Sequence, residues 1–112
     1  MSVETVATAV TTDDEGYLID PAAWTPAVAE RIAHDEGIAL TDDHRRVIGF
    51  IREYHEEHRV APGVRFVIKF VERELGRGAA ARNDLFRMFP YGYVRQACKI
   101  AGMRQPRAWS TG

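Results

Sequence analysis

The sequence contains a single cysteine, Cys98, among 112 residues. An internal disulfide is therefore excluded, and the thiol is either a small core residue or a nucleophile that carries a group. The sequence also lacks any apolar run long enough to span a bilayer. Its N-terminal segment lacks the basic and apolar regions of a signal peptide. These absences predict a cytoplasmic protein without a membrane partner.

The sequence also lacks complete motifs for phosphate binding, metal binding and cysteine protease activity. The segment Gly76-Arg77-Gly78 has no preceding strand and no following glycine, so it does not match a phosphate-binding loop. His55 and His58 are three residues apart, but they do not form a His-Glu-x-x-His pattern, and we expect no metal and no cofactor. The triplet Gln96-Ala97-Cys98 starts like a caspase signature but lacks its glycine. A Cys/His hydrolase is therefore not expected.

The net charge of −1 hides an asymmetry between the two halves of the chain. Residues 1–59 contain 5 arginines and no lysine against 13 acidic residues, whereas residues 60–112 contain 10 basic and 3 acidic residues. One explanation is that the two halves neutralise each other within the fold. The other is that the basic half presents a surface to an anionic partner.

Hydrophobic periodicity predicts about five helices in a single domain. Mixed β-branched and polar residues followed by a turn predict a small β-hairpin or meander over residues 1–19. N-caps at Asp20 and Thr41 and the stop signals at Gly37 and Gly102 help to set the helix limits. The expected class is α+β and predominantly helical, with a helical region over 20–102 and a flexible C-terminal arm over 103–112. The first helix is expected to run from near Pro21 or Thr25 to Glu36, and the others at about 42–59, 63–75, 80–88 and 93–101.

Two interpretations of Cys98 remain open on the residues alone. A helix over 93–101 places Cys98 on one stripe with Ala97, which favours a buried core thiol. Arg95 lies three residues earlier and Lys99 is adjacent, and positive charge lowers the pKa of a thiol. The carboxyl end of the helix acts in the opposite direction.

The predicted helices over 42–59 and 63–75, joined by a Pro-Gly turn, could also form a helix-turn-helix pair. Arg65, Lys69 and Arg73 would then lie on an exposed face and contact phosphates. A solvated amphipathic helix is the alternative, and the sequence pI of about 6.4 does not favour DNA binding. A DNA-binding regulatory protein therefore remains a second hypothesis.

Short motifs in a fixed order extend over most of the chain. They are Asp14-Glu15-Gly16-Tyr17-Leu18, Trp24, Glu36-Gly37-Ile38, Asp43-His44, Ala61-Pro62 with Val64-Arg65, Leu85-Phe86 with Phe89-Pro90-x-Gly92, and Gln96-Ala97-Cys98-Lys99-Ile100-Ala101-Gly102 with Pro106. Through them the chain resembles the DsrC/TusE family of sulfur-relay proteins. The resemblance implies an orthogonal array of about five helices, an N-terminal β-meander and a mobile C-terminal arm.

The resemblance also implies a function, since family members carry sulfur on cysteine and are typically not enzymes. It assigns Cys98 as the sulfur-carrying thiol and Arg65 as a residue that binds an anionic group or a partner. Arg95 and Lys99 are expected to support the thiolate because their positive charges lie next to it in the sequence. DsrC proper has a second cysteine in the arm, eleven residues after the first, where this chain has Trp109. This chain alone therefore cannot bridge two sulfur atoms.

The function expected from these residues is that of a DsrC-like accessory protein. It would dock on a sulfur-handling partner, such as a sulfite reductase, a heterodisulfide-reductase-like protein or a sulfurtransferase, and carry persulfide on one cysteine. A further alternative is a scaffold protein that docks on the same partner but carries out no sulfur chemistry itself.

Overall fold

The computed structural model describes residues 11–104, and within them the chain is predominantly helical. All five expected helices are found, although the last is a π-helix. The elements are η1 (Pro21–Ala23), α2 (Pro26–Asp35), α3 (Asp42–His58), α4 (Val64–Glu74), η2 (Gly78–Ala80), α5 (Ala81–Met88) and η3 (Tyr93–Cys98).

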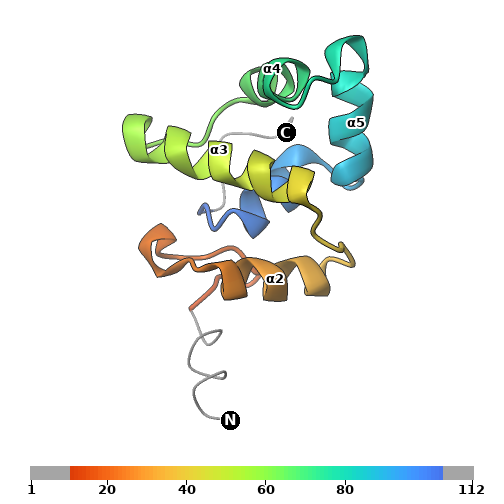
Figure 1. Ribbon diagram of the computed structural model, residues 1–112. Coiled ribbons are helices and arrows are strands. Elements are labelled where there is room, and N and C mark those ends of the chain that lie inside the picture. Colours follow the sequence, from red (N-terminus) through yellow and green to blue (C-terminus); the bar gives the residue numbers. More distant parts are fainter. Residues whose placement is uncertain (1–10, 105–112) are drawn as a thin grey trace.

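The helices lie around the last element, η3. Figure 1 shows α2 on one side of α3 and α4 on the other, with η3 and the segment after it between α2 and α3. Helix α4 packs against both α3 and α5, and η3 contacts α3. The segment that contains the cysteine is therefore in the interior of the fold.

Side-chain caps fix where the first helices begin. The Asp20 carboxylate accepts the backbone N–H of Ala22 at 3.0 Å, and Pro21 follows as the first residue of η1. The Thr25 hydroxyl accepts the N–H of Val28 at 3.2 Å to start α2. These caps satisfy donors that have no partner within the helix. Of the two starts expected for the first helix, the one near Thr25 is that of α2, while Pro21 begins the separate short helix η1.

The apolar stripes of the helices form one core. Apolar residues of α2, α3 and α4 are buried together, while Val64, Ile68 and Leu75 are partly buried at the edge. Aromatic and aliphatic residues from α5 and η3 complete the core. Its main members are Val28, Ile32, Val47, Ile48, Ile51, Val67, Val71, Leu85, Phe89, Tyr93, Ala97, Cys98 and Ile100.

The β-hairpin expected over residues 1–19 is not supported in the part that the structure describes. Residues 1–10 lie outside the described residues, and residues 11–104 contain no strand. Only an isolated antiparallel bridge joins Thr12 to Leu18. The Asp13 carboxylate accepts the backbone N–H groups of Glu15 and Tyr17 at 2.9 and 3.0 Å. An aspartate that binds nearby backbone donors stabilises a turn rather than a ladder.

The arm expected over 103–112 lies mostly outside the described residues, which end at residue 104. Its first residue, Met103, is buried and packs into the core. Each helix in the described part falls short of the length and apolar character that crossing a membrane requires.

Candidate functional site around Cys98

Cys98 ends η3 with a side chain that is 0% exposed. A side-chain hydrogen bond joins its thiol to Tyr93, whose hydroxyl donates to the carbonyl of Pro62 at 2.5 Å. Burial raises the pKa of the thiol to about 12, and the hydrogen bond with Tyr93 offsets this only in part. At neutral pH the sulfur is therefore a protonated thiol inside the core.

The two flanking cations do not activate this thiol in the described conformation. The pKa of Cys98 is raised rather than lowered, and neither Arg95 nor Lys99 is among its causes. The Lys99 ammonium lies 2.7 Å from the Glu36 carboxylate and 5.2 Å from the ring centre of Tyr17. Arg95 is exposed on η3. The positions of Arg95 and Lys99 next to Cys98 in the sequence therefore did not predict that Lys99 would pair with Glu36 instead of the thiol.

Glu36 forms one side of the enclosure around η3. The side-chain amide of Gln96 donates to it at 3.2 Å, in addition to the contact from Lys99. The other end of the Gln96 amide accepts the backbone N–H of Tyr91 at 2.9 Å. Burial alone would raise the pKa of Glu36, but the hydrogen bonds from Lys99 and Gln96 hold it below its ordinary value. The residue after α2 is thereby tied to the cysteine segment.

Trp24 and Arg52 hold the segment after Cys98. The indole N–H of Trp24 donates to the carbonyl of Ile100 at 2.9 Å, and Arg52 Nη1 donates to that of Ala101 at 2.7 Å. The Arg52 guanidinium also lies 4.3 Å from the centre of the Trp24 ring. Gly102 has φ +79°, and an added Cβ would lie 2.5 Å from the Trp24 ring. We call Trp24, Glu36 and Arg52 together the η3 clamp.

The sequence motifs found two of these three residues without indicating what they do. Trp24 and Glu36 belong to the family motifs, but their role in holding η3 requires the fold. Arg52 was missed. The available signal was its position four residues after the buried Ile48, which puts a charged residue on the apolar side of α3.

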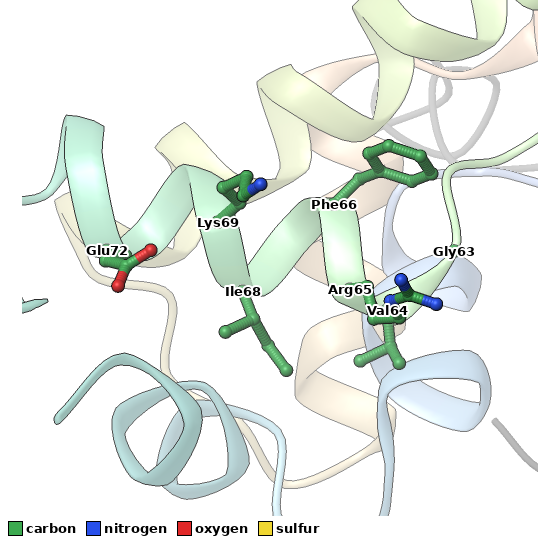
Figure 2. Close-up of a pocket in the computed structure, with 7 residues that line it drawn as sticks. All are labelled: Gly63, Val64, Arg65, Phe66, Ile68, Lys69 and Glu72. Carbon is green, nitrogen blue, oxygen red and sulfur yellow. The ribbon is translucent and has the colours of Figure 1, made fainter. Parts of the chain in front are cut away.

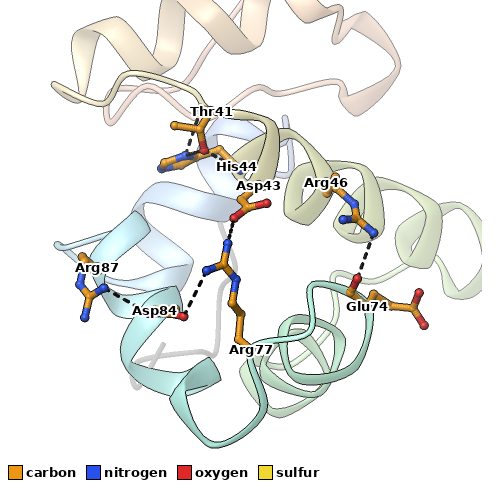
Figure 3. Close-up of polar contacts among 8 residues, drawn as sticks. All are labelled: Thr41, Asp43, His44, Arg46, Glu74, Arg77, Asp84 and Arg87. Carbon is orange, nitrogen blue, oxygen red and sulfur yellow. Dashed lines mark hydrogen bonds and ion pairs between the residues drawn. The ribbon is translucent and has the colours of Figure 1, made fainter.

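The Asp43-His44 motif proves to be structural. His44 Nδ1 accepts the backbone N–H of Thr41 at 3.2 Å, and Nε2 donates to the carbonyl of Met88 at 3.0 Å. Asp43 forms an ion pair with Arg77, whose guanidinium also lies 3.9 Å from Asp84 (Figure 3). These contacts tie the start of α3 to the helices of the basic half.

The cations predicted to contact phosphates, Arg65, Lys69 and Arg73, all lie on α4 and not in the segment that contains Cys98. Arg65, Lys69 and Arg73 are exposed, as expected. A groove of about 540 Å³ beside them is lined in part by Phe66 and Glu72 (Figure 2). No cluster of three or more metal-ligating side chains occurs in the described part of the chain.

The fold and the site together define a class of protein. It is a small helical protein with one cysteine enclosed at the end of η3. A family model described as DsrC like protein matches residues 4–108. The chain therefore belongs to the DsrC-like family.

Relatives and solved structures agree with this assignment. The chain is 38% identical over 97 residues to sulfurtransferase TusE of Pectobacterium atrosepticum, covering 87% of this chain and 89% of the relative. It is 43% identical over 94 residues to TusE of Buchnera aphidicola subsp. Schizaphis graminum, covering 84% and 82%. The oxidized gamma-subunit of the dissimilatory sulfite reductase (DsrC) from Archaeoglobus fulgidus matches with TM-score 0.83 and 32% identity, covering 89% and 91%. Allochromatium vinosum DsrC matches with TM-score 0.77 and 40% identity, covering 88% of each chain.

These comparisons indicate a sulfur-relay protein. The helix-turn-helix DNA-binding hypothesis gains no support from them.

Proposed function

We propose that this protein is a cytoplasmic accessory component of a sulfur relay and that Cys98 is its sulfur-carrying thiol. Its partner would be a sulfite reductase, a heterodisulfide-reductase-like protein or a sulfurtransferase. The observation that carries the proposal is that the η3 clamp encloses the segment with the chain's one cysteine, and this segment is also its most specific family motif. An unpaired thiol suits a reducing compartment.

The transfer itself needs no oxidant. The Cys98 thiolate attacks the outer sulfur of a donor persulfide, R–S–SH. The donor S–S bond breaks, a new S–S bond forms at Cys98, and the donor leaves as the thiolate R–S⁻. The Cys98 proton is lost before the attack. The product is a persulfide on this chain, and the sum of oxidation states is unchanged.

This step requires η3 to open, because the resting thiol is enclosed and protonated. Opening breaks the contacts of Glu36 with Lys99 and of the clamp with the Ile100 and Ala101 carbonyls. Lys99, released from Glu36, then joins Arg95 as a positive charge close to the sulfur. Both cations favour the thiolate in this open state. Docking on the partner supplies the free energy of opening.

A docking scaffold without sulfur chemistry is the second candidate function. The complete burial of Cys98 and the raised pKa of its thiol favour it, because both are typical of a cysteine that serves only as a core residue. The two candidates differ in whether the sulfur of Cys98 ever reacts.

Intact-protein mass spectrometry after incubation with a small-molecule persulfide distinguishes the two candidates. We expect wild type to gain the mass of one sulfur atom slowly and Cys98→Ala to gain none. Glu36→Gln weakens the clamp and should gain sulfur severalfold faster than wild type. Glu30→Gln, which removes a carboxylate from the exposed pair with Arg45, serves as the matched control and should react like wild type. If wild type and Glu36→Gln both remain unmodified, the scaffold function replaces the carrier.

A further inference from the structure

We propose that the exposed side of α4 is the surface with which this protein docks on an acidic protein partner. We call the set Arg65, Phe66, Lys69 and Arg73 the α4 face. The inference rests on the proposed docking function and names the surface and the chemistry of its partner. The partner would present carboxylates to the three cations and an apolar side chain to Phe66.

The charge of this face is not balanced within the fold. Arg65, Lys69 and Arg73 follow one another at four-residue spacing, so they share one side of the helix. In the described residues, none of the three forms an ion pair with a carboxylate, whereas exposed cations elsewhere, such as Arg45 and Arg77, do. Three adjacent uncompensated cations attract an acidic surface and orient its approach.

An exposed aromatic side chain lies beside these cations. Phe66 is 54% exposed, and its ring lies 5.8 Å from that of Tyr54. Tyr54 in turn contacts Phe50, which stacks on Phe70 at 4.7 Å. The exposed ring is therefore the end of an aromatic row anchored in the fold. Aromatic and arginine side chains supply much of the binding energy at protein interfaces.

The surface is hollowed at the same place. Figure 2 shows Arg65 and Phe66 projecting from the first turn of α4 and Lys69 one turn further along. The groove of about 540 Å³ is lined there by Val64 and Ile68 as well as by charged residues. The groove is therefore lined by both apolar and charged side chains, and protein interfaces combine the two.

An acidic protein fits this face better than a nucleic acid does. Glu72 lines the groove and Glu74 ends the helix, so carboxylates are interspersed with the cations of α4, which disfavours a continuous line of phosphates. A protein partner places its carboxylates individually and avoids this obstacle.

The test uses a fluorescently labelled acidic amphipathic peptide, with glutamates on one face and leucines along its edge, and the intact protein. Fluorescence anisotropy should show binding that weakens with added salt. Lys69→Glu and Phe66→Ser should each weaken it at least about threefold. Helix α5 provides matched controls, since Arg82 is an exposed cation and Phe86 is 46% exposed. Arg82→Glu and Phe86→Ser should leave the affinity within about twofold of wild type.

Backbone NMR shifts locate the binding site independently of these variants. The shifts caused by the peptide should be largest over residues 63–73. The proposal is overturned if the peptide does not bind, if α5 shifts as strongly as α4, or if a single-stranded oligonucleotide binds more tightly than the peptide. Cys98→Ala should bind the peptide like wild type, so failure of the carrier function and failure of this docking surface give different results.

Discussion

Cys98 owes its properties to its place in the fold rather than to its neighbours in the sequence. Its position within the family motif suggests a reactive group, whereas burial raises the pKa of its thiol to about 12. Tyr93 is the one side chain with a hydrogen bond to it that counteracts burial. Thiols in this condition react slowly with oxidants and alkylating reagents. The enclosure therefore shields the sulfur from such reagents.

The raised pKa of Cys98 predicts a loss of stability in alkaline solution. Its pKa is raised from 9.0 to about 12, so above pH 9 the unfolded chain releases a proton that the folded state keeps. The stabilisation is fully present below pH 9 and is lost as the pH rises toward 12. Between pH 9 and 10 we expect wild type to lose about 1 kcal/mol of unfolding free energy more than Cys98→Ala does.

Urea denaturation of both proteins at pH 8, 9 and 10 measures this difference. The pKa values of Tyr17 and Tyr93 are also raised above 10, so measurements stop there to keep their contribution small. Parallel declines in wild type and Cys98→Ala would show that the thiol is not held protonated by the fold.

At the scale of elements, the helices were predictable and the enclosure of η3 was not. Thr41 and the apolar stripe that follows it locate α3 because a cap and a helical period are local signals. The clamp consists of contacts between distant residues, since Trp24 is 76 positions from Ile100 and Arg52 is 49 from Ala101. Local patterns carry no information about such pairs. The π-helical geometry of η3 also leaves no signature in a segment this short.

The segment that follows η3 should tolerate no side chain at Gly102. Its φ of +79° is costly for other residues, and a Cβ would lie 2.5 Å from the Trp24 ring. Gly102→Ala should therefore lower the unfolding free energy by about 2 kcal/mol or more. Gly49 in α3 is the matched control, because nothing lies within 4 Å of its added Cβ. Gly49→Ala should raise stability by about 0.5–1 kcal/mol. Equal effects in urea denaturation would contradict the tight packing of the clamp.

At the scale of the whole molecule, the charge asymmetry is neutralised only in part within the fold. Lys99 and Arg77 of the basic half form ion pairs with Glu36 and Asp43 of the acidic half. The cations of the α4 face do not, although all ten basic residues look alike in the sequence. Which cations pair internally depends on how α3, α5 and η3 meet. The single-domain organisation over 1–112, the arm and the roles of Arg95, Lys99 and Arg65 stay predictions.

The internal neutralisation of the two halves can be tested at Arg77. This residue joins the start of α3 to α5 by contacting both Asp43 and Asp84 (Figure 3). Arg87 also contacts Asp84, but the pair lies within one helix and its arginine side chain is 77% exposed. Arg77→Gln should lower the unfolding free energy by about 1 kcal/mol, and Arg87→Gln by less than about 0.5 kcal/mol.

Both variants are compared with wild type by urea denaturation at low salt and in 1 M sodium chloride. The Debye length shortens to about 3 Å at 1 M salt, so the deficit of Arg77→Gln should shrink there. A deficit that is independent of salt would assign the effect of Arg77 to packing of its side chain. A deficit no larger than that of Arg87→Gln would show that the ion pair of Arg77 with Asp43 does not stabilise the fold. Neutralisation between the two halves would then rest on the pair of Lys99 with Glu36.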